Sequence, residues 1–259
     1  MKPPYVLISH NTAYSYPTSK LSPENIRFDH SDLLDSNLIY HWFTTNCNWK
    51  GSESGLPKPQ KLSCIRIPIG VTNRHNKIGL PPERYFRAME EIPLKRQKLL
   101  YIPSGLGNVT MELEREIIGH HGVSIAENNT TWVTIARQEE NWNDFAREAR
   151  DHKFVLCAKG DLDSHLLWEM LLLGSIPVII SSSLDSLYDG LPIATLGGWS
   201  DLTEDHLKKE WERISNSGFE LDRVFWPYWE NRIREMIDKA RSYFSEYQAE
   251  GEALAFAAL

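Results

Sequence analysis

The residues best suited to bind an anionic ligand lie within residues 154 to 180. Lys159-Gly160 follows an apolar run of strand length, and an apolar segment of helix type that contains His165 and Glu169 comes next. A lysine and a glycine before a helix suit phosphate, because the free N–H groups and the dipole at a helix N-terminus favour negative charge. Glu169 is flanked by apolar residues, and a buried carboxylate needs a partner such as a pair of sugar hydroxyls. The stretch therefore predicts a site for phosphate and hydroxyl groups.

Strand, helix and strand alternate around these side chains. The sequence predicts strands at residues 154 to 157 and 176 to 180, joined by a helix that ends at Gly174, a residue typical of the left-handed cap. Open α/β sheets bind ligands outside the carboxyl ends of their strands, so Lys159 and the first turn of the helix should face a ligand. The same unit also occurs in proteins where it binds nothing, and a purely structural role stays open.

This stretch resembles the donor-binding signature of exostosin-like glycosyltransferases. The matching parts are Lys159-Gly160, Asp163-Ser-His-Leu-Leu-Trp-Glu169 and Leu173-Gly-Ser-Ile-Pro-Val178. Further similar segments begin at Asp35, Ile65, Ser183 and Gly198, so the resemblance spans most of residues 5 to 205. It is closest to the compact exostosin-like enzymes of large algal DNA viruses, among them xylosyltransferases. One departure is Leu166, where the family commonly has an arginine.

The resemblance implies both a fold and a reaction. The fold is α/β and GT-B-like, with two Rossmann-like lobes. A reduced N-terminal lobe for the acceptor covers residues 1 to 94, a nucleotide-sugar lobe covers 95 to 225, and a helix in residues 226 to 259 returns to brace the first lobe. The reaction is an inverting, metal-independent transfer of a sugar, best matched by xylose from UDP-xylose, to a hydroxyl of a glycan such as a viral glycan carrying fucose. No cofactor is expected, since the nucleotide sugar is a substrate. The alternative is a non-catalytic protein that binds nucleotide sugars or carbohydrates.

The resemblance and the order of elements also assign roles to individual residues. The donor-binding residues that we expect are Ser104, Thr110, Arg115, Trp132, Lys159, Gly160, Asp163, His165 and Glu169. The acceptor-binding residues that we expect are Asp29, Asn46, Asn73 and Arg74.

The general base is the open question. The family typically has an aspartate at the position of Ala13. Either the protein uses another base, or this chain is a variant from which the base has been removed. The other catalytic candidates are His10, Asn11 and His75.

A metal-dependent alternative rests on Asp161-Leu-Asp163, which matches the D-x-D pattern of the GT-A fold. Here the pair opens a helix, where Asp163 is expected to be the N-cap. Two carboxylates without other oxygen ligands also make a poor Mg²⁺ or Mn²⁺ site. The pattern therefore favours a cap over a metal site.

Composition excludes several other classes. A net charge of −7 over 259 residues, without a basic stripe, argues against a nucleic-acid partner. Three cysteines without C-x-x-C spacing indicate neither a zinc site nor a disulfide framework, so we expect reduced thiols. No signal peptide and no apolar run approaching ~18 residues is visible, so we expect no membrane partner and a cytoplasmic protein, in the host cytoplasm if it is viral. Oligomeric state is not predicted.

Overall fold

The computed structural model describes residues 5–9, 18–19, 28–29, 39–47, 63–71, 81–103, 132–136, 141–157 and 163–257. The chain forms two compact units, of which unit 1 comprises Met1–Ile67 with Phe225–Leu259 and unit 2 comprises Pro68–Val224. We had expected the first lobe to extend to residue 94. Each unit contains a parallel sheet, and six α-helices lie in the described part of the chain, which confirms the α/β class.

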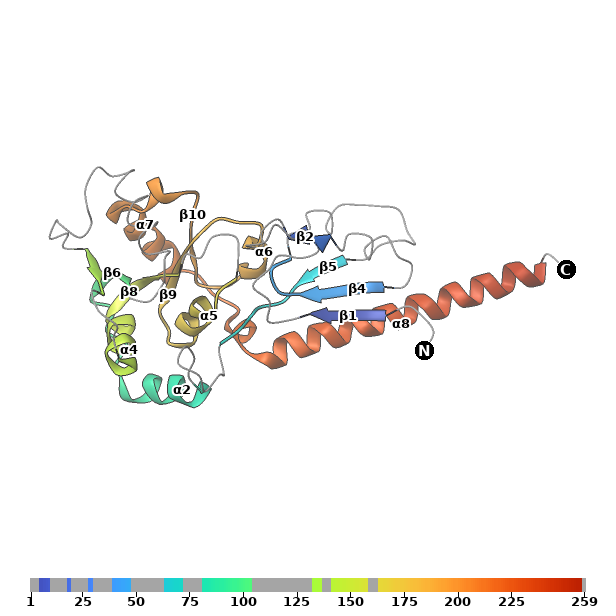
Figure 1. Cartoon of the computed structure of the whole chain (residues 1–259), viewed down its shortest axis with the longest axis horizontal. Coiled ribbons are helices and arrows are strands. Elements are labelled where there is room, and N and C mark those ends of the chain that lie inside the picture. The colour runs from blue at the N-terminus through green and yellow to red at the C-terminus, as the bar shows by residue number, and fades with distance from the viewer. Residues whose placement is uncertain are drawn as a thin grey trace. The chain divides into compact units, whose positions relative to one another are not determined.

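Unit 1 is built on a parallel sheet of three strands in the order β1 (Tyr5–Ser9), β4 (Ile39–Thr44) and β5 (Ser63–Arg66) (Figure 1). The strands β2 (Thr18–Ser19) and β3 (Phe28–Asp29) form a separate antiparallel pair. Side chains also link β1 to β4, because the indole N–H of Trp42 donates to Ser9 Oγ at 2.9 Å and the Ser9 hydroxyl donates to Thr44 at 2.7 Å. These bonds lie near the carboxyl ends of the two strands.

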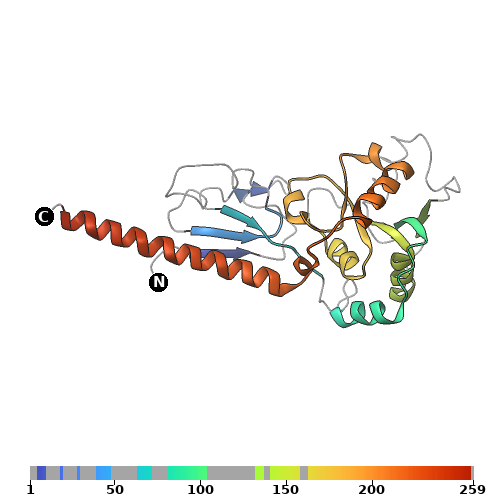
Figure 2. The ribbon, with the colours of Figure 1, turned by 180° about the vertical axis from the view of Figure 1, so that it is seen from behind.

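The helix α8 (Trp226–Ala257) belongs to unit 1 and follows the last residues of unit 2 in the chain (Figure 2). Its buried side chains are Trp229, Ile233 and Ala240, which recur at helical spacing and form one apolar stripe. Trp226 is 65% exposed and lies outside this stripe. It is the first residue of the helix, and the stripe begins only at Trp229.

Unit 2 contains a parallel sheet of five strands in the order β10-β9-β8-β6-β7. These strands are β6 (Lys98–Ile102), β7 (Val133–Ile135), β8 (His152–Leu156), β9 (Ile176–Ile180) and β10 (Ala194–Leu196). The strand β7 lies on one side of β6, and the later strands β8, β9 and β10 lie in order on the other side. This is a doubly wound arrangement in which the strand order reverses between β6 and β8.

Apolar strands and capped helices account for this sheet. Leu100, Phe154 and Val178 of adjacent strands are completely buried, as expected for a parallel sheet covered on both faces. Five α-helices lie in the described part of the unit: α2 (Pro82–Glu91), α4 (Trp142–Asp151), α5 (His165–Leu172), α6 (Asp185–Tyr188) and α7 (Glu204–Ser215). Two short 3₁₀ helices, η1 (Trp199–Asp201) and η2 (Leu221–Val224), also lie in it. Gly174, with φ +78°, follows α5 in the left-handed region, which confirms the predicted cap.

A buried arginine joins three helices of unit 2. The Arg150 guanidinium, in the last turn of α4, donates to Ile92 O at 2.7 Å and to Met89 O at 3.3 Å, both at the end of α2. It also donates to the carbonyl of Leu173, at the end of α5. Arg96 donates to Gly174 O at 2.6 Å. These cations sit at helix C-termini, where the helix dipole favours positive charge.

Two findings bear on the earlier expectations about cysteines and membranes. Cys47 is disulfide-bonded and Cys157 is a free, buried thiol, so the expectation that all thiols are reduced is wrong for Cys47. Spacing along the chain gave no sign of this bond, because the fold brings cysteines together independently of their separation in sequence. None of the described helices has the length and apolar character needed to span a bilayer.

Candidate functional site

The carboxyl ends of β6 and β8 mark the place where unit 2 is expected to bind a ligand. These two strands are neighbours, and the strand order reverses between them. Open α/β sheets bind ligands in the crevice at such a point. Ser104 comes two residues after β6, and Lys159-Gly160 come three and four residues after β8. Predicted donor-binding residues therefore follow, in the sequence, both of the strands between which the order reverses.

Asp163 is the centre of the polar groups at the start of α5. Its side chain is 2% exposed and accepts hydrogen bonds from four donors among the described residues. The donors are Ile69 N at 2.7 Å, Ser164 N at 3.0 Å, Trp168 Nε1 at 2.9 Å and the Tyr188 hydroxyl at 3.0 Å. Burial raises the pKa of the Asp163 carboxyl, and these hydrogen bonds oppose the rise. The carboxylate thus links the backbone at residue 69 to the helices α5 and α6.

This arrangement changes the interpretation of Asp163. The N-cap of α5 is Ser164, whose hydroxyl accepts from Leu167 N, so the expectation that Asp163 caps the helix is wrong. Both residue types are good caps, and the backbone places Ser164 at the helix start while Asp163 turns toward the interior. The lone pairs of a carboxylate oxygen that accepts hydrogen bonds point at the donor hydrogens, and a metal ion would have to occupy those same directions. The bonds seen at Asp163 therefore fit a structural anchor better than a metal ligand.

His165 forms a second link to the segment that contains Ile69. Its Nδ1 lies 2.7 Å from the carbonyl oxygen of Gly70, a glycine with φ +70°. A carbonyl only accepts, so Nδ1 carries the hydrogen, and Nε2 is the remaining polar atom of the ring. Among the described residues, Nε2 has no hydrogen-bond partner, and the side chain is only half-buried. His165 is thus oriented by the protein and keeps one nitrogen for another group.

Glu169 is buried one turn further along α5 and has a protein partner. Its side chain is 9% exposed and interacts with the phenol of Tyr85 of α2. Burial, followed by the charge of Glu169, raises the pKa of the Tyr85 phenol. From the sequence we had expected sugar hydroxyls to be the partner of this carboxylate. Since Tyr85 can fill that need, burial of Glu169 no longer favours a ligand by itself.

Cys157 completes this group at the carboxyl end of β8. Its thiol is completely surrounded by protein and donates to Val155 O at 3.4 Å. Burial, and then the nearby charge of Glu169, raises its pKa well above the ordinary value. The pKa of Tyr188 is raised as well, first by burial and then by Asp163. The neutral forms of both groups are favoured, so neither is prepared to act as a nucleophile or base.

Trp132 and Asn46 lie at different places in the fold. Trp132 directly precedes β7 and packs against the hydrophobic core, at the end of the sheet opposite to the carboxyl edge. It is therefore not brought together with Asp163 and His165. Asn46, in unit 1, is 2% exposed and has φ +56° just after β4 ends. It thus follows the carboxyl end of a strand of the unit 1 sheet.

The remaining predicted residues lie in β3 or outside the described part of the chain. Asp29 lies in β3, where it pairs with Thr18. Outside the described residues lie His10, Asn11, Ala13, Asn73, Arg74, His75, Ser104, Thr110, Arg115, Lys159 and Gly160. In the sequence, Ala13 comes four residues after the end of β1.

No protein-family model matches the chain, and no curated protein is significantly similar to it. The resemblance to exostosin-like enzymes therefore rests on the motifs quoted above.

Sequence reasoning missed four participants of this group: Tyr85, Cys157, Tyr188 and the segment Ile69-Gly70. Tyr188 falls in a run that had been matched to the family, but nothing in its spacing linked it to Asp163. Tyr85 lies 84 positions before Glu169, and no local pattern connects residues so far apart. The one available signal was the isolated acid within an apolar helix, which indicated that a partner existed but not which one.

Proposed function

We propose that the chain is a glycosyltransferase that binds a nucleotide sugar at the carboxyl edge of the unit 2 sheet, between β6 and β8. One observation supports this proposal above the others: Ser104 and Lys159-Gly160 follow in sequence the adjacent strands β6 and β8, where the strand order reverses. The start of α5 lies beside the same edge, and His165 is held there by Gly70 with Nε2 directed away from that bond.

The proposed chemistry is direct displacement at the anomeric carbon. An acceptor hydroxyl attacks while the nucleoside diphosphate leaves from the opposite face, so positive charge is needed at the diphosphate. We assign that role to Lys159 and to backbone N–H groups, and we assign to Nε2 of His165 a contact with a hydroxyl of the sugar. Removing one such donor commonly lowers the rate by ~10²- to 10³-fold. Binding of the ribose by Glu169 remains part of the proposal, although Tyr85 now competes for the same carboxylate.

The proposed donor is UDP-xylose and the proposed acceptor is a glycan hydroxyl, with fucose as the best match. Both follow from the resemblance to the compact viral enzymes. The acceptor candidates Asn46 and Ala13 follow neighbouring parallel strands of unit 1, β4 and β1. Loops that leave one edge of a parallel sheet from adjacent strands can contribute to one site, which supports assigning the acceptor to that edge.

A second candidate function is binding of nucleotide sugars without transfer. It is favoured by the alanine at position 13, where the family typically has its aspartate base. A missing general base removes a contribution that is typically ~10²- to 10⁴-fold in rate but leaves donor binding intact.

Release of UDP from UDP-xylose in the presence of a fucose-bearing glycan tests the transfer. The chain and its Ala13→Asp variant should both bind UDP-xylose, and the variant should release UDP ~10² times faster or more. A chain that transfers xylose at the same substantial rate with either residue uses another base. If both proteins bind the donor and neither transfers xylose to any acceptor offered, the non-catalytic function is supported.

A further inference from the structure

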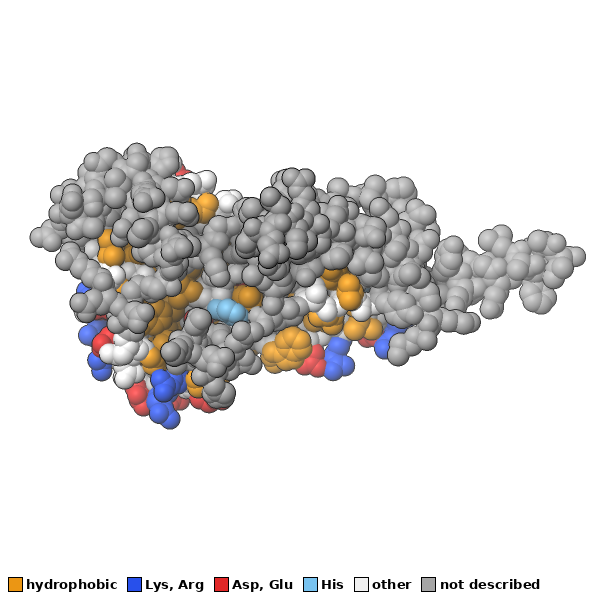
Figure 3. All heavy atoms as spheres, in the orientation of Figure 1, with side chains coloured by type: hydrophobic (Ala, Val, Ile, Leu, Met, Phe, Trp, Pro, Cys, Tyr) orange, Lys and Arg blue, Asp and Glu red, His pale blue; other side chains and the backbone are white. Residues whose placement is uncertain are grey.

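A cavity between α2 and α4 of unit 2 has the size and chemistry of a second ligand site. Its volume is about 740 Å³, within the range of ~300 to 1,000 Å³ that small-molecule sites occupy. One wall comes from α2 and the segment after it, and the other comes from α4. The lining charged residues are Arg84, Arg87, Glu91, Lys95, Arg147, Glu148 and Asp151. In the space-filling view, basic and acidic side chains gather over these two helices (Figure 3).

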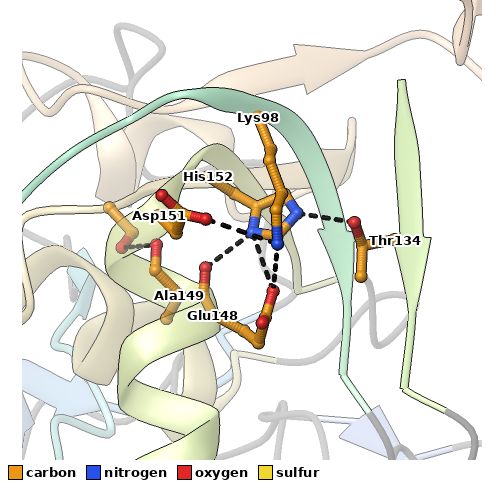
Figure 4. Close-up of polar contacts among 7 residues, drawn as sticks. Lys98, Thr134, Glu148, Ala149, Asp151 and His152 are labelled. Atoms are coloured by element: carbon orange, nitrogen blue, oxygen red, sulfur yellow. Dashed lines mark hydrogen bonds and ion pairs between the residues drawn. The ribbon is translucent and has the colours of Figure 1, made fainter. Parts of the chain in front are cut away.

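The two carboxylates of the α4 wall, Glu148 and Asp151, are both paired with one cation of the sheet. Lys98 Nζ lies 3.0 Å from Glu148 Oε2 and 3.3 Å from Asp151 Oδ2 (Figure 4). His152 supports the same corner, since its Nδ1 lies 2.6 Å from Glu148 O and its Nε2 lies 2.8 Å from Thr134 Oγ1. Burial lowers the pKa of His152, so the ring stays neutral and adds no charge. Two of the three lining carboxylates are therefore occupied.

The cations of the other wall are not neutralised in this way. Arg84, Arg87 and Lys95 have no carboxylate within 4.0 Å among the described residues. Arg147 has one, Asp144 at 3.5 Å, but both side chains are more than half exposed, so this pair contributes little. Arg150, which donates to the carbonyl of the lining residue Ile92, adds a buried positive charge behind the wall. Three cations, Arg84, Arg87 and Lys95, thus face one carboxylate, Glu91, on the side of α2, which leaves this side with a net positive charge.

The remaining lining residues indicate what an anion would carry with it. A bare phosphate would leave most of the cavity empty. Trp142 is half-buried in the wall, where it packs edge to face against Tyr85 with ring centroids 4.8 Å apart. An indole gives a ring-shaped ligand an apolar face, while Asn143 and Glu91 can bond hydroxyl groups. These features together suit a phosphate group attached to a hydroxylated ring.

We propose that the cavity between α2 and α4 binds a small phosphorylated sugar or a metabolite of the same chemistry, with Arg84, Arg87 and Lys95 on the phosphate. This site is separate from the proposed donor site. Lys95 and Pro93 precede β6 and Asp151 precedes β8, so they lie by the amino ends of strands whose carboxyl ends carry the predicted loops. The inference does not depend on the chain being a glycosyltransferase.

Calorimetric titration of the full chain with glucose 6-phosphate, inorganic phosphate and glucose tests the site. Glucose 6-phosphate should bind at one site, more tightly than phosphate, and glucose should not bind detectably. The Arg84→Gln/Arg87→Gln double variant should weaken the binding of glucose 6-phosphate about tenfold or more, because charged hydrogen bonds to phosphate are strong. The matched control is Lys209→Gln/Arg232→Gln, which removes the same charge from exposed positions elsewhere and should change the affinity less than about twofold.

Three results would overturn the inference. One is the absence of glucose 6-phosphate binding to the wild-type chain. The second is equal weakening in the double variant and in the control, which would indicate only general attraction by net charge. The third is displacement of glucose 6-phosphate by UDP, which would assign the phosphate to the carboxyl edge of the sheet. If UDP fails to bind at all, the proposed function fails, while the comparison of the two double variants still decides this inference.

Discussion

Replacing Asp163 by asparagine should loosen the connection between α5 and the segment around Ile69. The carboxylate accepts from Ser164 N and the Tyr188 hydroxyl through Oδ1 and from Ile69 N through Oδ2, and Trp168 Nε1 lies 2.9 Å from both oxygens. An asparagine keeps the shape but replaces one oxygen by an NH₂ group. If its carbonyl takes the place of Oδ1, its NH₂ faces the N–H of Ile69, and neither can accept.

The size of the effect follows from these contacts. One buried donor without a partner costs about 1 to 3 kcal/mol, and the remaining bonds become weaker because the acceptor is no longer charged. Loss of the desolvation cost of the carboxylate offsets part of this. We expect a net loss of about 2 to 4 kcal/mol in the free energy of unfolding of unit 2. Tyr188→Phe removes one donor and leaves the carboxylate its bonds to Ile69, Ser164 and Trp168, so its cost should be smaller, about 1 to 2 kcal/mol.

Urea unfolding followed by circular dichroism gives the stability, and hydrogen exchange of the Ile69 amide gives a local readout. In Asp163→Asn this amide should exchange about tenfold faster or more, even where unit 2 remains folded. The control is Asp222→Asn, which makes the same chemical change at an exposed position. The reasoning is refuted if Asp163→Asn changes stability no more than this control does, or if exchange at Ile69 is unaltered.

The remaining predictions concern charge, packing and the cysteines. The pKa of His41 is lowered to about 4 by burial and by the charge of Lys239. The unfolded chain therefore binds a proton at His41 below pH ~6.5, whereas the folded chain binds it only near pH 4. The free energy of unfolding, measured in urea titrations, should fall by about 2 kcal/mol between pH 7.5 and pH 5. His41→Gln should remove this pH dependence. Arg150→Met leaves three backbone carbonyls without their donor and should lower the free energy of unfolding, measured in urea, by more than about 3 kcal/mol. The control Arg147→Met, on the exposed face of the same helix, should lower it by less than about 0.5 kcal/mol. Alkylation of the denatured chain, read by mass spectrometry, should modify one thiol before reduction and three after it, because Cys47 is disulfide-bonded and Cys157 is free; three modified thiols before reduction would contradict the disulfide.

The elements around the candidate site could be predicted because their signals are local. Strand-length apolar runs, the helix between them and Gly174 at its end are all encoded within residues 154 to 180, and the structure has β8, α5 and β9 there. Similar signals give α4, where Asn141 precedes the helix and accepts from Asn143 N and Asp144 N as a cap should.

The contacts between distant segments could not be predicted. The bond from Ile69 N to Asp163 spans 94 residues, and the bond between Gly70 O and His165 spans 95. Propensity and periodicity contain no information on such pairs, since they report only on neighbours within one element. The choice between Asp163 and Ser164 as cap was ambiguous for a related reason. Both side chains suit the position, and only the buried donors of Trp168 and Tyr188 show why the aspartate turns inward.

Calorimetric titration of the chain with UDP in the presence of EDTA tests the central claim most directly. The proposed site between β6 and β8 predicts one-site binding without metal, tighter with UDP-xylose than with UDP-glucose or GDP. Lys159→Gln should weaken this binding about tenfold or more, and Lys209→Gln should leave it unchanged. Absence of binding by any of these nucleotides, or equal affinity of the two lysine variants, would contradict the assignment of this edge as a nucleotide-sugar site.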